Sequence, residues 1–355
     1  MRVYCDEMKA VKEQYDKISG SVKNGIYIFG AGLGGVWSVD WLKETGHKIE
    51  AFIDNAPTLV GRKIKGFSVI SYDDYMKRKD GKPILVSTNL YTKEILKCYG
   101  SKNKQMMSLK AYFYLKNEEV YSRFQFADSK SSKVLDGIIQ AMCLSDDSYL
   151  NKICEGNEYH ALPQFYGNFV KTYIDCGAYV GDSVERFIWA HDANIERIIA
   201  FEPGKKQFGA LKMRSKRLVE EWALRKEQIT LVNAAVGSRT NKVTYIESTD
   251  LSGSRTDRNI SDGEMVASYA LDDYLEENDV VDFIKVDIEG AECEMLQGAR
   301  GTICSCKPNL SVCVYHKIDD LIRVYSILKE YVPEYHFSLR HHSPKLVGTV
   351  LYAWV

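Results

Sequence analysis

The sequence predicts a two-domain protein of the α/β class, in which a small α/β domain precedes a larger seven-stranded sheet. At 355 residues, the chain exceeds the roughly 250–300 residues at which single hydrophobic cores stop growing. From residue 169 onward, strand-like and helix-like stretches alternate. Roughly 20 residues separate the first strands, as in the βαβ units of a parallel sheet. Only a short segment, His341–Gly348, joins the last two strands. This is too short for a helical crossover, so we expect these strands to pair antiparallel.

The expected elements of the larger sheet follow one another in a regular order. Its strands are short apolar runs at 172–176, 197–201, 229–236, 282–286, 309–315, 336–339 and 349–354. Helical stretches are expected between them at 182–191, 204–224, 291–303 and 319–331. This pattern divides the chain into a small N-terminal domain (1–110), a helical connector (111–168) and a C-terminal domain (169–355).

Composition excludes several classes of protein. Hydrophobic residues make up 45% and charged residues 27% of the chain, and the formal net charge is −1. This balance gives no electrostatic reason to expect nucleic acid or an anionic membrane as a partner. No apolar run approaches the roughly 20 residues that cross a bilayer, and the N-terminus lacks a signal-peptide core. The 9 cysteines form no CxxC pair and are expected to be reduced. We therefore expect a soluble, cytoplasmic protein, with its oligomeric state left open.

The N-terminal domain contains a glycine-rich loop between a strand and a helix. The strand at 25–29 runs into Gly30, Gly32 and Gly35, a helix is expected at 36–45, and a second strand at 49–53 ends in Asp54. This order is typical of a dinucleotide-binding fingerprint, with the acid placed to meet a ribose. However, after a third strand at 83–87 the domain ends near residue 110, too early for two mononucleotide-binding halves.

The pattern GAGxxG…FIDN resembles the small Rossmann-like domain found on sugar-modifying enzymes. The resemblance implies either binding of a nucleotide or nucleotide-sugar at Gly30, Gly32, Gly35 and Asp54, or only a structural role. In the connector, Ser129–Ser132 indicates a break, followed by an amphipathic helix at 134–144. The aromatic segment 159–166 is interpreted as a packed linker, with a cover over a ligand as the alternative.

The stretch Thr172–Asp182, TYIDCGAYVGD, organises the C-terminal domain. An apolar strand ends at Asp175 and opens into Gly177, Tyr179, Gly181 and Asp182. Glycines are needed where a strand turns sharply into a helix near a ligand. Two carboxylates beside the turn argue against a pyrophosphate and suit a cationic ligand, such as the amino acid portion of S-adenosylmethionine (AdoMet). The alternative is an acidic turn without function.

Ligands of open α/β sheets lie beyond the carboxyl ends of the strands. The second strand ends at Glu202, whose carboxylate could accept both hydroxyls of a ribose. The third runs into Asn233 and Ala234, where small residues permit an adenine to lie flat and Asn233 could contact its edge. A tightly packed turn is the alternative at this last position.

The fourth and fifth strands carry the candidate catalytic residues. Asp287 and Glu289 follow the fourth strand, with Lys285 inside it, and His316 follows the fifth. Crowded carboxylates raise one another's pKa unless a cation such as Lys285 or a metal lies between them. An unperturbed histidine has the pKa of a general base near neutral pH. We expect His316 or Asp287 to be the base. The alternative is a divalent ion, held by Asp287, Glu289 and His316, that acidifies the hydroxyl.

The polar stretch 248–263 lies between the third and fourth strands and is rich in Ser, Asp and Arg. It is interpreted as a loop or lid over the pocket. Arg255 and Arg258 could bind an anionic group of the acceptor.

Together these residues resemble the FkbM family of AdoMet-dependent methyltransferases over about 159–355. The motifs that carry the resemblance are TYIDCGAYVGDS, FEP, NAAVG, ALDDYL, FIKVDIEGAECEMLQGA and SVCVYHKIDDL. The resemblance implies a Rossmann-like methyltransferase sheet, with its seventh strand inserted antiparallel. It also implies O-methylation of hydroxyls, AdoMet contacts at Asp175, Gly177, Asp182 and Glu202, and Asp287 and Glu289 at the site of methyl transfer.

The sequence therefore predicts an AdoMet-dependent O-methyltransferase acting on a sugar, nucleotide-sugar or related polyol hydroxyl. No metal is expected, although one is possible. An NAD-linked oxidoreductase using the Gly30–Gly35 loop and a non-catalytic nucleotide-sugar-binding protein are the alternatives.

Overall fold

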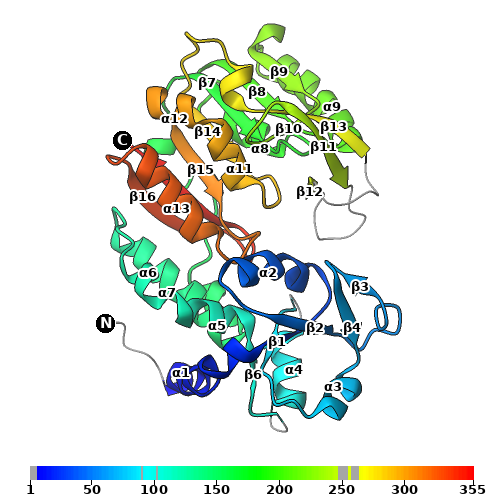
Figure 1. The fold of residues 1–355 in the computed structure, drawn as a ribbon. Coiled ribbons are helices and arrows are strands. Elements are labelled where there is room, and N and C mark those ends of the chain that lie inside the picture. Colours follow the sequence, from blue (N-terminus) through cyan, green and yellow to red (C-terminus); the bar gives the residue numbers. More distant parts are fainter. Residues whose placement is uncertain (1–5, 89–90, 101–102, 247–254, 257–263) are drawn as a thin grey trace.

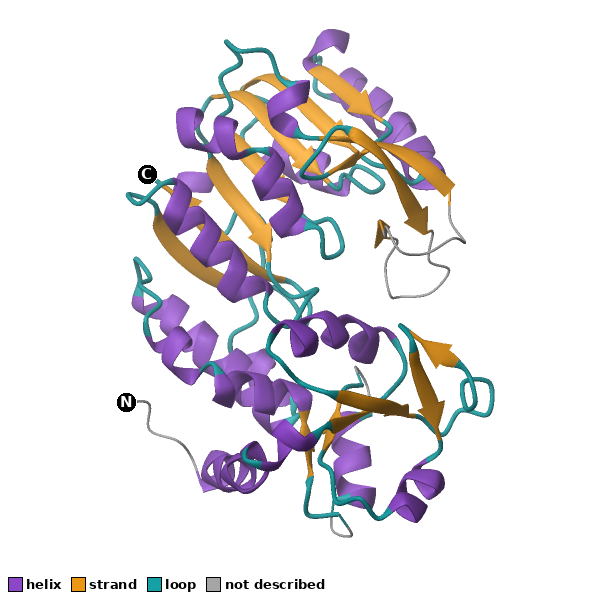
Figure 2. Ribbon diagram, in the orientation of Figure 1, coloured by secondary structure: helices purple, strands orange, loops and turns teal. Residues whose placement is uncertain are grey.

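The fold consists of two mainly parallel β-sheets, one in each half of the chain, with helices packed around them (Figures 1 and 2). The computed structural model describes residues 6–88, 91–100, 103–246, 255–256 and 264–355. None of the helices in this described part is both long and apolar enough to cross a membrane.

The N-terminal half contains a 6-stranded sheet in the order β3-β4-β2-β1-β5-β6. Its strands are β1 (Ile26–Phe29), β2 (Ile49–Ile53), β3 (Lys63–Ile64), β4 (Phe67–Ile70), β5 (Ile84–Val86) and β6 (Met106–Ser108). Its helices are α1 (Asp6–Ser19), α2 (Leu33–Glu44), α3 (Tyr72–Arg78), α4 (Thr92–Tyr99) and α5 (Leu109–Lys116), with a 3₁₀ turn η1 (Ser21–Asn24). All neighbouring strands are parallel except β3 and β4.

The expected strands at 25–29, 49–53 and 83–87 are present as β1, β2 and β5. The sequence analysis did not identify β4 and β6, which extend the sheet on either side. Both are short, so neither carries a hydrophobic period long enough to recognise. Helix α2 begins at Leu33 rather than at residue 36, because the glycine loop passes directly into the helix.

The connector is helical and packs against the C-terminal sheet. It comprises α6 (Glu118–Ser122), α7 (Ser129–Leu144) and the 3₁₀ turns η2 (Asp147–Lys152) and η3 (Pro163–Phe165). Ser129–Ser132 forms the first turn of α7 and is not a break, so that expectation was wrong. The reason is Asp128, whose side chain caps the helix by accepting the amide of Ser131 at 2.8 Å. The Ser131 hydroxyl in turn accepts the amide of Leu339 at 2.9 Å, which joins α7 to the C-terminal sheet.

The C-terminal half contains a 7-stranded sheet in the order β16-β17-β15-β14-β7-β8-β9. The strands are β7 (Val170–Cys176), β8 (Ile195–Phe201), β9 (Ile229–Val232), β14 (Phe283–Val286), β15 (Asn309–Cys313), β16 (His336–His341) and β17 (Thr349–Trp354). The strands from β15 to β9 are parallel to one another. β17 lies between β15 and β16 and is antiparallel to both, which confirms the prediction from the short final connection.

Helices cover this sheet, and a second, smaller sheet adjoins it. The helices are α8 (Asp182–Ala190), α9 (Lys205–Glu221), α10 (Leu271–Tyr274), α11 (Glu292–Gly298), α12 (Arg300–Cys306) and α13 (Asp320–Tyr331), with the 3₁₀ turn η4 (Lys226–Gln228). A 4-stranded sheet contains β10 (Ala235–Val236), β11 (Asn241–Ile246), β12 (Arg255–Thr256) and β13 (Glu264–Tyr269). The expected strand 229–236 therefore divides between two sheets, because the chain leaves the large sheet after Val232.

The parallel arrangement brings the ends of four strands to one edge of the large sheet. The carboxyl ends of β7, β8, β14 and β15 are neighbours, and their register pairs Asp175 with Lys285 and Cys176 with Val286. A continuous core, which includes Phe52, Phe113, Ile139 and Phe337, extends from the N-terminal sheet through the connector to this sheet. The loops at this edge thus rest on a buried and rigid base.

Candidate active site

The turn after β7 exposes its backbone at the edge of the sheet. Gly177, Tyr179 and Gly181 have φ angles of 88°, 47° and 85°, all in the left-handed region. A Cβ on Gly177 would lie 1.9 Å from the carbonyl oxygen of Asp287, so no side chain fits there. Tyr179 is 57% exposed. The turn therefore brings the β7 and β14 strand ends into close contact.

Asp175 lies beneath this turn in a buried ion pair. Its side chain is 0% exposed, and its Oδ1 lies 3.0 Å from Lys285 Nζ, which is 2% exposed. Its Oδ2 accepts hydrogen bonds from Ser183 Oγ at 2.6 Å and from Tyr173 Oη at 3.3 Å. The geometry does not support the expected contact between Asp175 and a cofactor, because all these partners belong to the protein interior. Lys285 was expected between Asp287 and Glu289, but its ammonium pairs with Asp175 and neutralises it. Its charge still lowers the pKa of Asp287.

Glu202 follows β8 and faces the same turn. Its Oε2 accepts the amide of Tyr179 at 2.9 Å, and its Oε1 accepts the amide of Gly204 at 2.7 Å. Each oxygen keeps a second lone pair for a ligand hydroxyl. Burial raises the pKa of Glu202 to about 7, although the two amides act in the opposite direction. The carboxylate is therefore fixed in place and adjoins the glycine turn.

Asn233, Ala234 and Asp182 complete the expected cofactor residues. The Asn233 amide donates to the carbonyl oxygens of Glu202 and Pro203 at 2.9 and 3.1 Å, so it links the ends of β8 and β9. Ala234 is buried. Asp182 is the first residue of α8 and is half-buried. With Asp175 neutralised, Asp182 and Glu202 are the acidic residues beside the turn.

Asp287 lies where β14 ends and is held by two tyrosines. The Tyr159 hydroxyl donates to Oδ2 at 2.8 Å, and the Tyr315 hydroxyl lies 3.3 Å from Oδ1. Burial alone would raise the pKa of Asp287, but Lys285 and His316 outweigh it and lower that pKa. Asp287 is therefore an oriented carboxylate and a weak base.

Glu289 is the more accessible carboxylate of the pair. Its backbone has a φ of 57°, a strained conformation for a residue other than glycine. Its side chain is 35% exposed, against 23% for Asp287. Burial raises the pKa of Glu289 to about 7, while His316 lowers it. The strained turn thus places at the sheet edge a carboxyl group that ionises near neutral pH.

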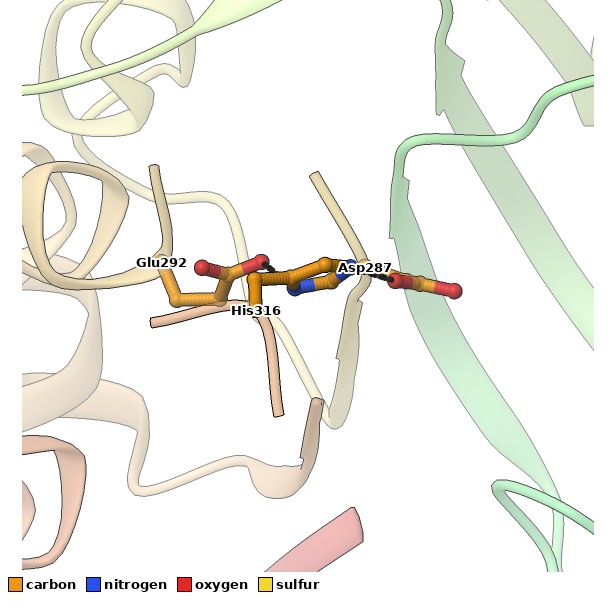
Figure 3. A group of neighbouring side chains, drawn as sticks. All are labelled: Asp287, Glu292 and His316. Atoms are coloured by element: carbon orange, nitrogen blue, oxygen red, sulfur yellow. Dashed lines mark ion pairs between the residues drawn. The ribbon is translucent and has the colours of Figure 1, made fainter. Parts of the chain in front are cut away.

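His316 follows β15 and lies between acidic side chains (Figure 3). Its Nδ1 lies 2.9 Å from Glu292, and its Nε2 lies 3.5 Å from Asp287 and 3.4 Å from Glu289. Burial lowers the pKa of His316, but Glu292, Asp287 and Glu289 outweigh burial and raise it to about 10. His316 is therefore an imidazolium at neutral pH. An imidazolium has no lone pair with which to accept a proton, so the geometry does not favour His316 as the base.

The same cluster is the place where a metal could bind. One ligand atom each from Asp287, Glu292 and His316 lies within 4.8 Å of the others. The chemistry of the three side chains suits Zn²⁺ or Fe²⁺ better than Mg²⁺. However, Glu292 Oε1 already accepts the amides of Ile288 and Gly290 at 3.2 Å each, and both oxygens of Asp287 face tyrosine hydroxyls. Because these oxygens already have partners in the protein, the contacts favour a protonated His316 over a metal ion as the positive charge between the carboxylates.

The chain was compared with known proteins. Residues 175–338 match the family model described as the methyltransferase FkbM domain. This region, hereafter the FkbM domain, is similar to that family. The match runs from Asp175 through β16, so it contains Glu202, Asp287, Glu289 and His316, and it confirms the resemblance seen in the sequence. No curated protein sequence matches the chain.

The chain is similar to several solved structures. The methyltransferase FkbM from Methylobacillus flagellatus KT is 19% identical and aligns over 98% of this chain and 99% of its own, with a TM-score of 0.60. An rRNA methylase from Streptococcus thermophilus is 11% identical over 54% of this chain and 89% of its own, with a TM-score of 0.31. Fibrillarin from Aeropyrum pernix, with natively bound S-adenosyl-L-methionine, is 12% identical over 58% of this chain and 72% of its own, with a TM-score of 0.34. The first alignment shows that the fold is shared along nearly the whole chain.

The structure adds two residues that the sequence analysis did not assign to the site, Tyr159 and Glu292. Tyr159 belongs to the aromatic segment interpreted as a packed linker; it has a φ of 70°, and its ring centroid lies 5.2 Å from Lys285 Nζ. Glu292 is fully buried beside His316. No pattern in the sequence predicts the left-handed backbone of Tyr159. Glu292, by contrast, is the third acid of the motif DIEGAE and could have been recognised as a candidate site residue. Tyr159 therefore orders Asp287, and Glu292 orders His316.

The N-terminal glycine loop is held by its own backbone. A Cβ on Gly35 would lie 1.9 Å from the carbonyl oxygen of Gly30, whereas one on Gly32 would meet no atom within 4 Å. Asp54 accepts the amides of Ala31 and Ala56, both at 2.9 Å. Asp54 thus fastens the loop and retains one lone pair on each oxygen. Nucleotide binding at this loop stays a prediction.

The expected lid at 248–263 lies largely outside the described residues, and Arg258 is among those not described. Arg255 belongs to β12, of which only the backbone is described. Its expected contact with an acceptor stays a prediction.

Proposed function

We propose that this protein is an AdoMet-dependent O-methyltransferase whose acceptor is a hydroxyl of a sugar, nucleotide-sugar or related polyol. The FkbM domain supports methyl transfer. The observation that carries the finer proposal is Glu289, a half-exposed carboxyl group with a pKa of about 7 beside the oriented Asp287. A hydroxyl must lose its proton to become methylated, and a base is most effective when its pKa lies near the working pH.

The residues around the turn after β7 fit AdoMet. The cofactor would lie against this turn, whose left-handed Gly177 and Gly181 pack directly against Asp287 and Leu211. Glu202 would hold the ribose hydroxyls with its free lone pairs, and Asp182 would face the cationic amino acid portion. When bound, AdoMet supplies an electrophilic methyl group on a positively charged sulfur.

The remaining residues orient and deprotonate the acceptor. Glu289 would accept the proton that the acceptor hydroxyl loses. Asp287, fixed by Tyr159 and Tyr315, would hold that hydroxyl in line by accepting a hydrogen bond from it. The His316 imidazolium stabilises both carboxylates in their ionised form. Because the base is a carboxylate and not a metal, this chemistry needs no divalent ion.

Methyl transfer is tested directly by mass spectrometry. The purified protein is first analysed for bound adenosyl ligands and sugar nucleotides, and is then incubated with AdoMet and a panel of sugars, sugar nucleotides and polyols. We expect S-adenosylhomocysteine together with a product 14 mass units heavier than one of the hydroxyl compounds. A product methylated on nitrogen or carbon, with no O-methylated compound, would contradict the proposal.

The N-terminal loop is proposed to bind the nucleotide portion of a sugar nucleotide. We expect a sugar nucleotide at millimolar concentration to slow hydrogen exchange at the amides of Gly30–Gly35, and AdoMet to leave them unchanged. Gly32→Val should remove this protection while the fold stays intact, because the added side chain enters open space at a φ of −81° and a ψ of −170°. Absence of protection by every nucleotide tested would assign the loop a structural role only.

A further inference from the structure

A cavity of about 70 Å³ lies between the connector and the FkbM domain. At roughly 10–15 Å³ for each water molecule, this volume holds several waters or one small organic group. Its lining is mainly aliphatic, with Leu135, Ile138 and Met142 from α7 and Leu321 from α13 among the residues that form it. A cavity lined in this way favours the apolar part of a ligand over water.

Lys110 is a charged residue in this mainly apolar lining, and its ammonium group has no hydrogen-bond or ion-pair partner among the described residues. Within the described parts of the chain, no hydrogen bond, ion pair or ring contact joins it to another residue. Burial lowers the pKa of Lys110, and the acid that acts on it from nearby, Asp147, is paired with Lys345 at 3.1 Å. Lys110 is also the second residue of α5, where the helix dipole disfavours a cation. Lys110 is half-buried, and the carboxylate of a bound ligand would give its ammonium a partner.

Lys317 brings a second positive charge to the same wall. Its ammonium lies 3.7 Å from Glu294, and its side chain is 31% exposed. Burial lowers the pKa of Lys317, but Glu294, Asp320 and Glu292 outweigh burial and raise it. The cavity therefore combines an aliphatic lining with two lysines. Among the described residues, Lys317 has the carboxylate of Glu294 beside it, whereas Lys110 has no such partner.

We propose that this cavity binds a small aliphatic carboxylate, with the carboxylate against Lys110 and the carbon chain between α7 and α13. A carboxylate has two oxygens to satisfy. A phosphate has more, and among aliphatic side chains the additional oxygens would lack donors. The site is distinct from the proposed cofactor site and does not depend on the methyl-transfer proposal. It adjoins the active site, because Tyr315 lines the cavity and its hydroxyl lies 3.3 Å from Asp287.

Calorimetry with the full-length protein tests the class of ligand. Acetate, butyrate, 1-butanol and inorganic phosphate are titrated separately at millimolar concentration. We expect butyrate to bind more tightly than acetate by about fourfold for each added methylene, the factor that burial of a CH₂ group supplies. We expect 1-butanol and phosphate to bind at least about tenfold more weakly than butyrate. The reason is that 1-butanol lacks the carboxylate and phosphate lacks the carbon chain.

Lys110→Met tests the lysine without removing side-chain volume. We expect butyrate affinity to fall by about ten- to a hundredfold, as for the loss of a charged hydrogen bond. We also expect the melting temperature of the free protein to rise or stay unchanged, because an unpaired charge is removed. Lys133→Met, an exposed position on α7, is the matched control and should alter neither quantity. Equal butyrate binding by the folded Lys110→Met protein, tighter binding of phosphate than of butyrate, or no binding of any carboxylate by the wild-type protein would overturn the proposal.

Discussion

Replacement of Lys285 by methionine is expected to lower the free energy of unfolding by about 3–5 kcal/mol, the range for breaking a buried ion pair by removing one partner. Asp175 would remain fully buried and charged without its partner at 3.0 Å. The Lys285 ammonium also donates to the carbonyl oxygen of Gly177 at 2.6 Å, so the turn beneath the proposed cofactor site would lose a contact. Urea unfolding followed by circular dichroism measures the change.

Two further variants test whether the destabilisation comes from the loss of the buried Lys285–Asp175 pair or would follow the removal of any lysine. Lys307→Met breaks an exposed pair with Glu334 and should cost at most about 1 kcal/mol. Adding Asp175→Asn to Lys285→Met should recover part of the loss, because no uncompensated charge is then buried. Equal effects of Lys285→Met and Lys307→Met would show that the buried pair does not stabilise the sheet edge.

The second large effect is expected at Glu289. Glu289→Gln should reduce the rate of methyl transfer by about 10²–10⁴-fold, the contribution of a positioned general base. AdoMet affinity should stay nearly unchanged, because the proposed cofactor contacts lie at the turn after β7 and at Glu202. Single-turnover kinetics and calorimetry measure the two quantities. Glu294→Gln, a change to a partly exposed acid of α11, is the matched control and should keep the wild-type rate.

Chelation distinguishes this account from metal catalysis at the same cluster. The wild-type enzyme should keep its activity in EDTA, because the proposed base is a carboxylate. If EDTA abolished turnover and one added divalent ion restored it, Asp287, Glu292 and His316 would be metal ligands and Glu289 would not be the base.

The architecture could be predicted because it follows from local patterns. The alternation of strands and helices predicted the parallel sheet, and the short segment His341–Gly348 predicted the antiparallel β17. The two-residue strands β3 and β12 and the three-residue strands β5 and β6 are too short to show a period, so only β5, with its strong apolar run, was expected.

The electrostatics of the site could not be predicted, because they depend on contacts between distant segments. Asp175 was expected to contact the cationic portion of AdoMet, but the register of β7 against β14 places it beside Lys285. His316 was assigned the pKa of a free histidine, whereas Glu292 from a separate helix raises it. The spacing of residues along a sequence shows which acids are present, and the folded structure decides which of them remain exposed.

Titration of AdoMet into the purified protein tests the central claim most directly. We expect micromolar affinity, much tighter than for NAD, and a loss of about 1–3 kcal/mol in Glu202→Ala, where ribose hydroxyls lose their acceptor. Burial raises the pKa of Glu202 to about 7, so the group is mainly protonated at pH 6 and ionised at pH 8. Because only the ionised form offers both oxygens as acceptors, affinity should increase over this interval in the wild type and stay flat in Glu202→Ala. AdoMet binding no tighter than NAD binding, or a Glu202→Ala protein that binds AdoMet as the wild type does, would contradict the account.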